Sequence, residues 1–472
     1  MTSLMAFNGT LKAIQCTNTW RVPYTDLPKR TETVELRIPY YEGLELQKQL
    51  FQTHQEKVVI ALIGGATLSN SYLLLIHSLL PVPETEYVQS SAGTRWSPKF
   101  NAQAIDEAAK TRLGLLVLHS HGKQPKPDLS PTDIRNGASL CATFRAALPK
   151  HPHGTAVFGE GGSVGGLVWK PGQSKFVKVN SVRWVSDPIR RIPFPQTNYR
   201  PEERYSSQKL LIGDAGQKLL KVSKVGIIGL CGGGSHVVQQ LALAGIGTII
   251  AVDDERVEER NRHRLVGARP GDVSNGLAKT EIMRRLVRES NPDVKFVGLR
   301  ERFPSDKSSS LLKECDVLVG CVDTLYTRKE IQNFAWRYLI PYVDIGLTIE
   351  PDKTGAHAKR ISGQVYDLIP GASCLWCAQF LTEERLSKES GGLGPAYVVG
   401  GHQAQVVSFN GVLASQAVTE VLHIITGFST GRNIPNALQF DGIKGTLMPC
   451  ILKRRTACTV CNGELGKGDP IW

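Results

Sequence analysis

The stretch KVGIIGLCGGGSHVVQQLALAGIGTIIAVDD (residues 224–254) constrains the fold of this chain more than any other segment. An apolar strand leads into a glycine-rich turn, a helix follows, and a second apolar strand ends in two aspartates. Glycine lets the backbone approach a phosphate group closely, and the free N–H groups at a helix start attract its negative charge. The stretch therefore predicts a Rossmann-like α/β fold that binds a nucleotide.

The chain has 472 residues, which predicts two or three domains rather than one hydrophobic core. Upstream of the glycine-rich turn, apolar runs at 57–64 and 113–118 are typical of buried strands, and 99–112 is typical of an amphipathic helix. We expect an α/β domain at 1–184, a proline-rich linker at 185–202 and a Rossmann-like domain at 203–472.

Composition excludes several classes of protein. The most apolar segment, SYLLLIHSLLPV (71–82), is too short to cross a bilayer, and we find no secretory signal, so we expect a cytoplasmic protein without membrane contact. Ten cysteines in a reducing compartment indicate metal binding rather than disulfides. The formal charge of +13 is scattered along the chain without interleaved aromatic residues, which argues against a nucleic-acid partner and leaves an acidic protein partner open.

The residues after the glycine-rich turn narrow the chemistry. Asp253 can bind a ribose hydroxyl, which by itself also suits a nicotinamide dehydrogenase. Asn261, Arg264 and Lys279 add donors and positive charge where a triphosphate would lie, and Asp323 offers a hard oxygen ligand for Mg²⁺. Two cations and a metal-binding carboxylate suit nucleotidyl transfer, because negative charge develops on the phosphates in its transition state.

In this order the motifs resemble those of the ThiF-like ubiquitin-activating superfamily, over about residues 204–461. The resemblance implies a domain that binds ATP and Mg²⁺ and adenylates the C-terminal glycine of a ubiquitin-like protein. It places Asp323 at the magnesium-binding and catalytic position, with Arg264 and Lys279 also in catalytic roles. The resemblance implies nucleotide contacts from Gly229, Gly232, Gly234, Asp253, Asn261, Arg264 and Lys279.

Two departures from the family pattern bear on the reaction. Ser207 stands where relatives carry an arginine that reaches across a dimer, so we expect Arg204 or Lys209 to replace it if any residue does. The loop SGGLGPAYVVGGHQAQ lacks the cysteine that many relatives use as a nucleophile. We therefore expect the adenylate to pass to another protein, such as a ubiquitin-conjugating-type protein, or to a hydroxyl such as that of Ser408 or Thr382.

Two CxxC pairs, SCLWC and ACTVC, provide four thiolates that can close a tetrahedral zinc site. Such a site has no open coordination position, so its role would be structural. By the same resemblance, this zinc site fixes a crossover segment to the C-terminal tail. The four predicted ligands are Cys374, Cys377, Cys458 and Cys461.

A second candidate metal site lies in LHSHGKQPKPDLSPTD (118–133). His119 and His121 are two residues apart on a strand, so they share one face, and Asp133 can supply a third ligand. A water would then fill the fourth position, as catalytic zinc requires. Glu56, before the strand at 57–64, is the candidate base, and Ser130 can hydrogen-bond a developing oxyanion.

This arrangement resembles the JAMM (JAB/MPN-like) metalloprotease family, whose fold is of the α/β, cytidine-deaminase-like type. The resemblance implies hydrolysis of isopeptide or peptide bonds after the C-terminal glycine of ubiquitin-like proteins. The loop at 122–129 is one residue longer than the family's usual form, and Gly122 replaces a common proline.

The combined hypothesis is a fused enzyme, as in bacterial ubiquitin-like conjugation systems. The first domain would mature or deconjugate a ubiquitin-like protein, and the second would activate its exposed glycine. By resemblance, the chain would form a homodimer. The alternatives are an adenylating enzyme of a peptide or sulfur-carrier pathway with an inactive JAMM-like docking domain, a pure binding module, and a dehydrogenase.

Overall fold

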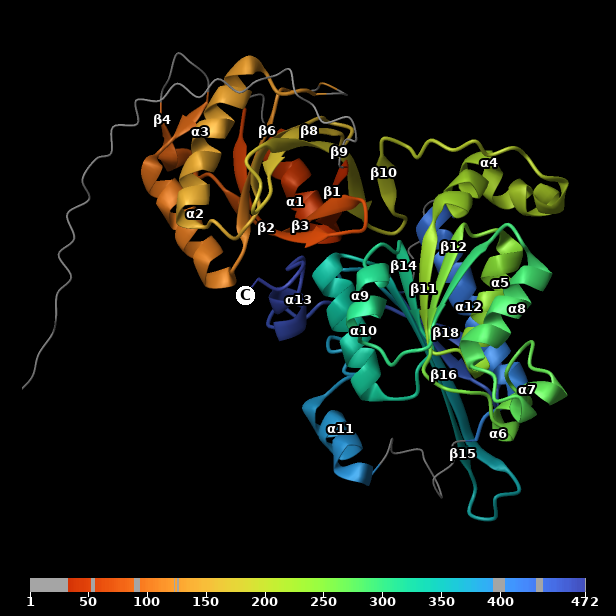
Figure 1. The fold of residues 1–472 in the computed structure, drawn as a ribbon. Coiled ribbons are helices and arrows are strands. Elements are labelled where there is room, and N and C mark those ends of the chain that lie inside the picture. Colours follow the sequence, from red (N-terminus) through yellow and green to blue (C-terminus); the bar gives the residue numbers. More distant parts are fainter. Residues whose placement is uncertain are drawn as a thin grey trace, which may run out of the picture. The chain divides into compact units, whose positions relative to one another are not determined.

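The computed structural model describes residues 33–51, 56–88, 94–122, 124, 127–393, 404–429 and 436–471. Its strands and helices are interspersed along the chain, as expected for an α/β protein, and can be followed in Figure 1. The first half comprises β1 (Thr33–Pro39), α1 (Tyr40–Phe51), β2 (Val58–Thr67), β3 (Ser71–Pro81), η1 (Glu84–Glu86), β4 (Tyr87–Val88), β5 (Arg95–Trp96), α2 (Pro98–Thr111), β6 (Gly114–Ser120), α3 (Pro131–Ala147), β7 (His153–Phe158), β8 (Val164–Trp169), β9 (Phe176–Val185) and β10 (Arg190–Ile192).

The second half carries the glycine-rich turn and both cysteine pairs. It comprises η2 (Glu203–Tyr205), α4 (Ser206–Val222), β11 (Lys224–Ile228), α5 (Gly232–Ala244), β12 (Thr248–Val252), α6 (Glu259–Arg262), α7 (Pro270–Ser274), α8 (Lys279–Ser290), β13 (Lys295–Leu299), α9 (Asp306–Leu312), β14 (Val317–Gly320), α10 (Leu325–Tyr338), β15 (Tyr342–Pro351), β16 (Ala358–Leu368), α11 (Glu383–Lys388), η3 (Glu389–Leu393), α12 (Val407–Thr426), β17 (Ala437–Asp441), β18 (Thr446–Cys450) and α13 (Thr459–Gly463).

The first sheet has the strand order β1-β3-β2-β6-β7-β8-β9-β10, and β1 also pairs with β9. Strand β2 lies at the centre of this half because it is buried on both faces. On one face, Val59, Ala61 and Ile63 pack in an apolar cluster with residues of α1. On the other face, Val58 and Ile60 pack in a second cluster with residues of α2 and α3. A strand buried on both faces needs apolar side chains at successive positions. The predicted linker, residues 185–202, includes β10, which pairs with β9.

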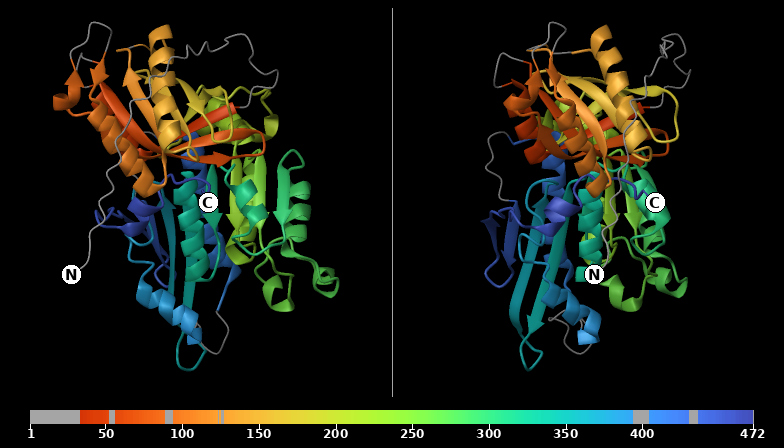
Figure 2. Two further views of the ribbon diagram at one scale, coloured as in Figure 1. Left: turned by 60° about the vertical axis from the view of Figure 1, so that its left-hand side comes forward. Right: turned by 90° about the vertical axis from the view of Figure 1, so that its left-hand side faces the viewer.

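The second sheet has the order β13-β12-β11-β14-β15-β16-β17-β18. Its strands are parallel from β13 to β15 and antiparallel from β15 to β18. The strand order reverses on either side of β11, between β12 and β14. In such sheets the ligand site lies at this reversal, at the carboxyl ends of the strands. Figures 1 and 2 show helices on both faces of this sheet.

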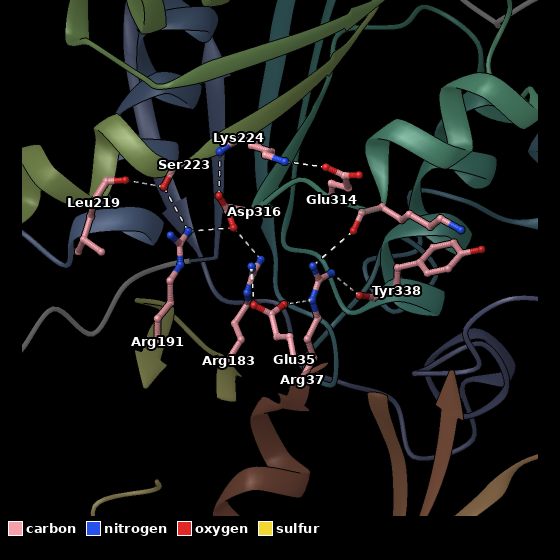
Figure 3. A network of polar contacts seen from close by, with 11 residues as sticks. Glu35, Arg37, Arg183, Arg191, Leu219, Ser223, Lys224, Glu314, Asp316 and Tyr338 are labelled. Carbon is pink, nitrogen blue, oxygen red and sulfur yellow. Dashed lines mark hydrogen bonds and ion pairs between the residues drawn. The ribbon is translucent and has the colours of Figure 1, made fainter. Parts of the chain in front are cut away.

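A buried network of charged side chains joins the two sheets (Figure 3). Asp316, just before β14, contacts Arg183 of β9 at 2.7 Å and Arg191 of β10 at 2.8 Å. Arg183 also contacts Glu35 of β1 at 3.0 Å, and Arg37 of β1 contacts Glu35 at 2.8 Å. The opposite charges compensate one another, which buried charged groups require.

Arg37 extends this network to the helices of the second sheet. Its guanidinium donates to the carbonyl oxygens of Tyr338, at the end of α10, and Lys313, just after α9, at 2.8 and 3.3 Å. Carbonyl groups at a helix end lack intrahelical partners, so a buried cation there stabilises both helices.

Among the described helices, none combines the length and the apolar character that crossing a membrane demands.

Candidate functional site

A cleft of about 1460 Å³ lies at the carboxyl ends of β11, β12 and β14. All but one of the predicted nucleotide-binding residues line it, although they come from separate elements. These are Gly229, Gly232, Asp253, Asn261, Arg264, Lys279 and Asp323. The exception, Gly234, packs within the turn, where a side-chain Cβ would lie 1.9 Å from the carbonyl oxygen of Gly229.

The glycine-rich turn is built by close backbone approaches. Gly229 has φ +89°, and a Cβ there would lie 2.5 Å from the carbonyl oxygen of Cys321. A Cβ at Gly232 would lie 2.6 Å from the amide nitrogen of Asn410, which also lines the cleft. Helix α5 begins at Gly232, so its first N–H groups are available to an anion.

Asp253 holds the turn in place. Its two carboxylate oxygens accept backbone N–H groups from Leu230 at 2.7 Å and Glu255 at 3.0 Å. Burial raises the pKa of Asp253 despite the opposing charge of Lys279 and these hydrogen bonds. Each oxygen keeps a second lone pair, so the predicted ribose contact is compatible with this arrangement.

The Lys279 ammonium is a buried cation of the cleft. Burial works against its charge, but Asp253 and Glu255 hold the pKa of Lys279 above its usual value. Glu255, which the sequence did not single out, pairs with the ammonium. Arg264 donates to the carbonyl oxygen of Arg260 at 2.9 Å, and Asn261 accepts the N–H of Glu258 at 3.0 Å.

Arg204 and Lys209, the candidate replacements for the arginine that reaches across a dimer in relatives, are both paired with residues of their own chain. Arg204 donates to Asn291 at 3.0 Å and pairs with Asp293, and Lys209 contacts Asp214 at 2.6 Å. A cation that crosses a dimer would have to leave these contacts. The prediction that one of them acts in trans therefore gains no support from this geometry.

The loop predicted to lack a nucleophilic cysteine spans 390–405, and most of it lies outside the described residues. The two proposed hydroxyl acceptors are described. Thr382 accepts the N–H of Arg385 at 3.2 Å as the cap of α11, and Ser408 lies in the first turn of α12. In the described part of the chain, neither residue lines the cleft.

The four cysteines of the two CxxC pairs come together at one point. The Sγ–Sγ distances are 3.6 Å for Cys374–Cys377, 3.6 Å for Cys374–Cys458 and 3.7 Å for Cys377–Cys461. Sulfur ligands about 2.3 Å from a tetrahedral zinc lie roughly 3.8 Å apart. The spacing of the thiols therefore fits a zinc ion bound by all four.

The N-terminal histidines and acids also gather, at the end of β6. The two His Nε2 atoms lie 3.2 Å apart, and Asp133 lies 3.4 Å from His119 and 3.1 Å from His121. Ligand atoms about 2.0 Å from a tetrahedral zinc lie roughly 3.3 Å apart. The separation of the two histidine nitrogens fits one edge of such a site. The two Asp133 distances run to different oxygens, Oδ1 toward His119 and Oδ2 toward His121, so both carboxylate oxygens face the histidines. Glu56, the predicted base, lies 3.9 Å from His119, and its carboxylate is close enough to both histidines to share a metal ion with them.

Neighbouring residues fix the side chains of the candidate zinc site by hydrogen bonds. Ser130 is the N-cap of α3: its hydroxyl accepts the N–H of Asp133 at 3.2 Å, and its own N–H donates to the Asp133 carboxylate at 2.7 Å. Burial opposes the charge of Asp133, but His119 and Ser130 lower its pKa far below the usual value. Thr94, which the sequence did not indicate, donates to Glu56 at 2.9 Å.

A model described as the ThiF family matches residues 205–460. The sulfur carrier protein ThiS adenylyltransferase of Escherichia coli K12 is 27% identical over 281 residues, which is 58% of this chain and 100% of that protein. The adenylyltransferase and sulfurtransferase MOCS3 is 30% identical in Dictyostelium discoideum and 31% in Caenorhabditis briggsae.

These matches cover 56% and 57% of this chain, and 57% and 62% of the two MOCS3 proteins, so the chain spans less than two thirds of their length. Among solved structures, Escherichia coli MccB with ATP is 22% identical over 55% of this chain and 75% of its own, with a TM-score of 0.45. MccB with N-formylated MccA gives 22% identity, 56% and 77% coverage, and a TM-score of 0.47.

Proposed function

The chain belongs to the ThiF family, and we propose that its nucleotide cleft activates the C-terminal carboxylate of a small protein or peptide with ATP. The carboxylate oxygen attacks the α-phosphorus, the bond from that phosphorus to the pyrophosphate oxygen breaks, and an acyl-adenylate and pyrophosphate form. The observation that carries this proposal is the buried Lys279 ammonium beside the glycine-rich turn, in a cleft that Asp323 also lines.

Each group has a role that its position supports. The N–H groups at the start of α5 and the cations Lys279 and Arg264 face negative charge that grows on the phosphates during transfer. Asp323 would hold Mg²⁺, which supplies further positive charge to the phosphate oxygens when bound. Lys279 is already ionised, so it needs no protonation step.

The names of the relatives bear on the partner. The ThiS adenylyltransferase is named for a sulfur carrier protein, and MOCS3 is named as an adenylyltransferase and sulfurtransferase. A sulfur-carrier-type protein or a peptide is therefore the partner class we propose. A ubiquitin-like protein ending in glycine is the narrower form of this proposal, and a conjugating-type acceptor stays a prediction.

Binding of ATP tests the proposed function without a partner. Calorimetry should show MgATP binding to the full chain, and Lys279→Met should weaken it about 10- to 100-fold, the loss expected for a buried charged contact. Lys295→Met, at an exposed position in β13, is the matched control and should bind as the wild type does. A wild-type chain that binds nicotinamide dinucleotide but not ATP would contradict the proposal.

We also propose that the N-terminal half binds a catalytic zinc ion through His119, His121 and Asp133. The separations among these ligands support this second function. Zinc supplies an activated water when bound. Glu56 would take the proton of that water, and the Ser130 hydroxyl would donate to the oxygen of the attacked carbonyl. The substrate would be a carrier extended beyond its C-terminal glycine, so hydrolysis would produce the carboxylate that the cleft activates.

Metal content and hydrolysis test this second function separately. The wild-type chain should bind two zinc ions, and His121→Ala and Cys458→Ala should each remove one. Glu56→Gln should keep both ions and abolish cleavage of a carrier with a C-terminal extension. Two ions without cleavage by the wild type would favour the inactive docking domain instead.

The two sheets meet at a junction that includes the charged network around Asp316 and the bridge between Gly65 and Gly468. The proposed zinc site and the nucleotide cleft both lie away from this junction. In β2, Val58 is the register partner of His119, whereas Gly65 bridges to Gly468, roughly 23 Å further along at 3.3 Å per residue. In the second sheet, Asp316 lies at the junction and Asp323 beyond the opposite end of β14. The short C-terminal tail of the carrier could therefore not occupy both sites at once, and it would have to leave the zinc site before it entered the nucleotide cleft.

Two exposed leucines support the proposed homodimer. Leu210 and Leu211 of α4 are 91% and 62% exposed, and they are adjacent, so they place exposed apolar surface on this helix, the kind of surface on which proteins associate when it is contiguous. Replacing both with glutamate should give monomers in sedimentation velocity if α4 lies in the interface.

A further inference from the structure

Arg328 lies beneath the turn that carries Asp323. It belongs to the first half of α10, and it is 4% exposed although it lines the floor of the cleft. Its Nη2 donates to the carbonyl oxygen of Val322 at 2.6 Å. Val322 directly precedes Asp323, so the guanidinium holds the peptide group through which the Asp323 backbone is attached.

The guanidinium is itself fixed from other sides. Its Nη1 pairs with Asp344 of β15, which is fully buried. The other oxygen of Asp344 accepts the hydroxyl of Tyr342 at 2.5 Å. The ring of Phe380 lies 5.5 Å from the guanidinium. The planar, always charged fork of arginine suits a site that must bind two acceptors in fixed directions.

The turn between β14 and α10, which carries Asp323, is fixed at both of its ends by hydrogen bonds. On its strand side, the N–H of Cys321 donates to the carbonyl oxygen of Ile228 at 2.8 Å, and on its helix side Thr324 caps α10. Between these two anchors, the carbonyl oxygen of Val322 is bound by Arg328. Without that hydrogen bond the peptide between residues 322 and 323 can rotate, which would move the Asp323 carboxylate relative to the glycine-rich turn.

We propose that Arg328 is a positioning residue for Asp323: it fixes the Val322 carbonyl and thereby sets the place of the carboxylate that would hold Mg²⁺. This rests on the proposed adenylation function. Arg328 acts through the backbone rather than through the nucleotide. It should therefore affect the magnesium-dependent part of ATP binding and leave the magnesium-independent part unchanged.

Calorimetric titration with ATP, in Mg²⁺ and in EDTA, tests this on the full chain. For Arg328→Gln we expect MgATP affinity to fall about tenfold, the loss of one charged hydrogen bond, and ATP affinity in EDTA to stay within about twofold. Asp323→Asn should show the same pattern. The double variant should lose no more than Asp323→Asn alone, because both substitutions disrupt one interaction.

Asp344→Asn provides a second route if Arg328→Gln does not fold, since it frees the guanidinium and keeps the arginine. Arg337→Gln, at the far end of the same helix, is the control and should leave both affinities unchanged. Equal loss in Mg²⁺ and EDTA, or additive losses in the double variant, would overturn the positioning role. A wild-type chain that binds no ATP at all would instead overturn the proposed function on which it rests.

Discussion

Asp469 accepts the backbone N–H of Thr67 at 2.9 Å, although 402 residues separate them in the chain. The same carboxylate accepts the hydroxyl of Tyr338 at 2.9 Å and contacts Lys313 at 3.1 Å. The short segment 464–469, which we call the strap, thus joins the end of β2 in the first sheet to the end of α10 beside the second. It begins three residues after Cys461.

Replacing Asp469 with alanine should loosen this junction. The change leaves the Thr67 N–H and the Tyr338 hydroxyl without their acceptor, and we expect local opening to become easier by about 2 kcal/mol. Hydrogen exchange at residues 65–67 should speed up accordingly. Asp106→Ala, at an exposed position of α2, is the control and should leave exchange unchanged. Unchanged exchange in Asp469→Ala would show that the contact contributes nothing.

The glycines of the strap should be harder to replace than glycines in open turns. Gly468 has φ +67°, and a Cβ there would lie 2.3 Å from the carbonyl oxygen of Gly65. Gly445, in the turn after β17, has φ +66° but nothing within 4 Å. Gly445→Ala should cost about 1 kcal/mol from backbone strain alone, and Gly468→Ala clearly more. Urea denaturation of both variants measures the difference, and equal costs would contradict the packing argument.

Removal of the proposed zinc ion from the four-cysteine site should release the strap. Cys458 and Cys461 fix α13, and the strap follows directly, with the N–H of Gly466 donating to the carbonyl oxygen of Trp336 at 2.9 Å. After treatment with a zinc chelator, we expect faster exchange both in the strap and at residues 65–67. His121→Ala, which removes only the other proposed zinc, should not reproduce this effect. Faster exchange confined to the cysteines would show that the strap holds without the metal.

Much of the candidate site could be predicted because its residues lie near one another in sequence or follow a fixed spacing. The glycine-rich turn lies between two strands of one βαβ unit, and the Ser130–Asp133 pair is a local cap of α3. The two identical CxxC spacings indicated a shared metal, and the thiols do converge. Local geometry of this kind follows from helix and strand periodicity, without knowledge of the tertiary fold.

The junction between the two sheets could not be predicted, because its residues are far apart in the sequence and follow no fixed spacing. Arg191 is one of two adjacent arginines, a pattern that is ordinarily a sign of a solvated surface, yet it is paired and largely buried against Asp316. Arg328 is one polar residue on an amphipathic helix, and only the fold shows that it points at Val322. Glycines such as Gly468 carry no side chain whose pattern could identify a partner four hundred residues away.

The Asp316 carboxylate should make the junction sensitive to acid. Burial alone would raise the pKa of Asp316, but Arg191 and Arg183 lower it below the usual value, whereas in the unfolded chain it would be about 3.9. Because the folded chain binds this proton more weakly, the carboxylate stabilises the fold fully above about pH 4 and less as the pH falls through its folded pKa. We therefore expect the wild-type urea midpoint to fall steeply below pH 4.

Asp316→Asn separates this effect from general acid denaturation. At pH 7 the variant leaves Arg191 without its carboxylate and Arg183 with Glu35 alone, so its free energy of unfolding should fall by about 3 kcal/mol. Since asparagine does not titrate, the difference from the wild type should shrink as the pH drops from 5 to 3. Asp106→Asn should follow the wild-type curve at every pH. A difference between Asp316→Asn and the wild type that stays constant across this range would show that the arginines do not depend on the charge of Asp316.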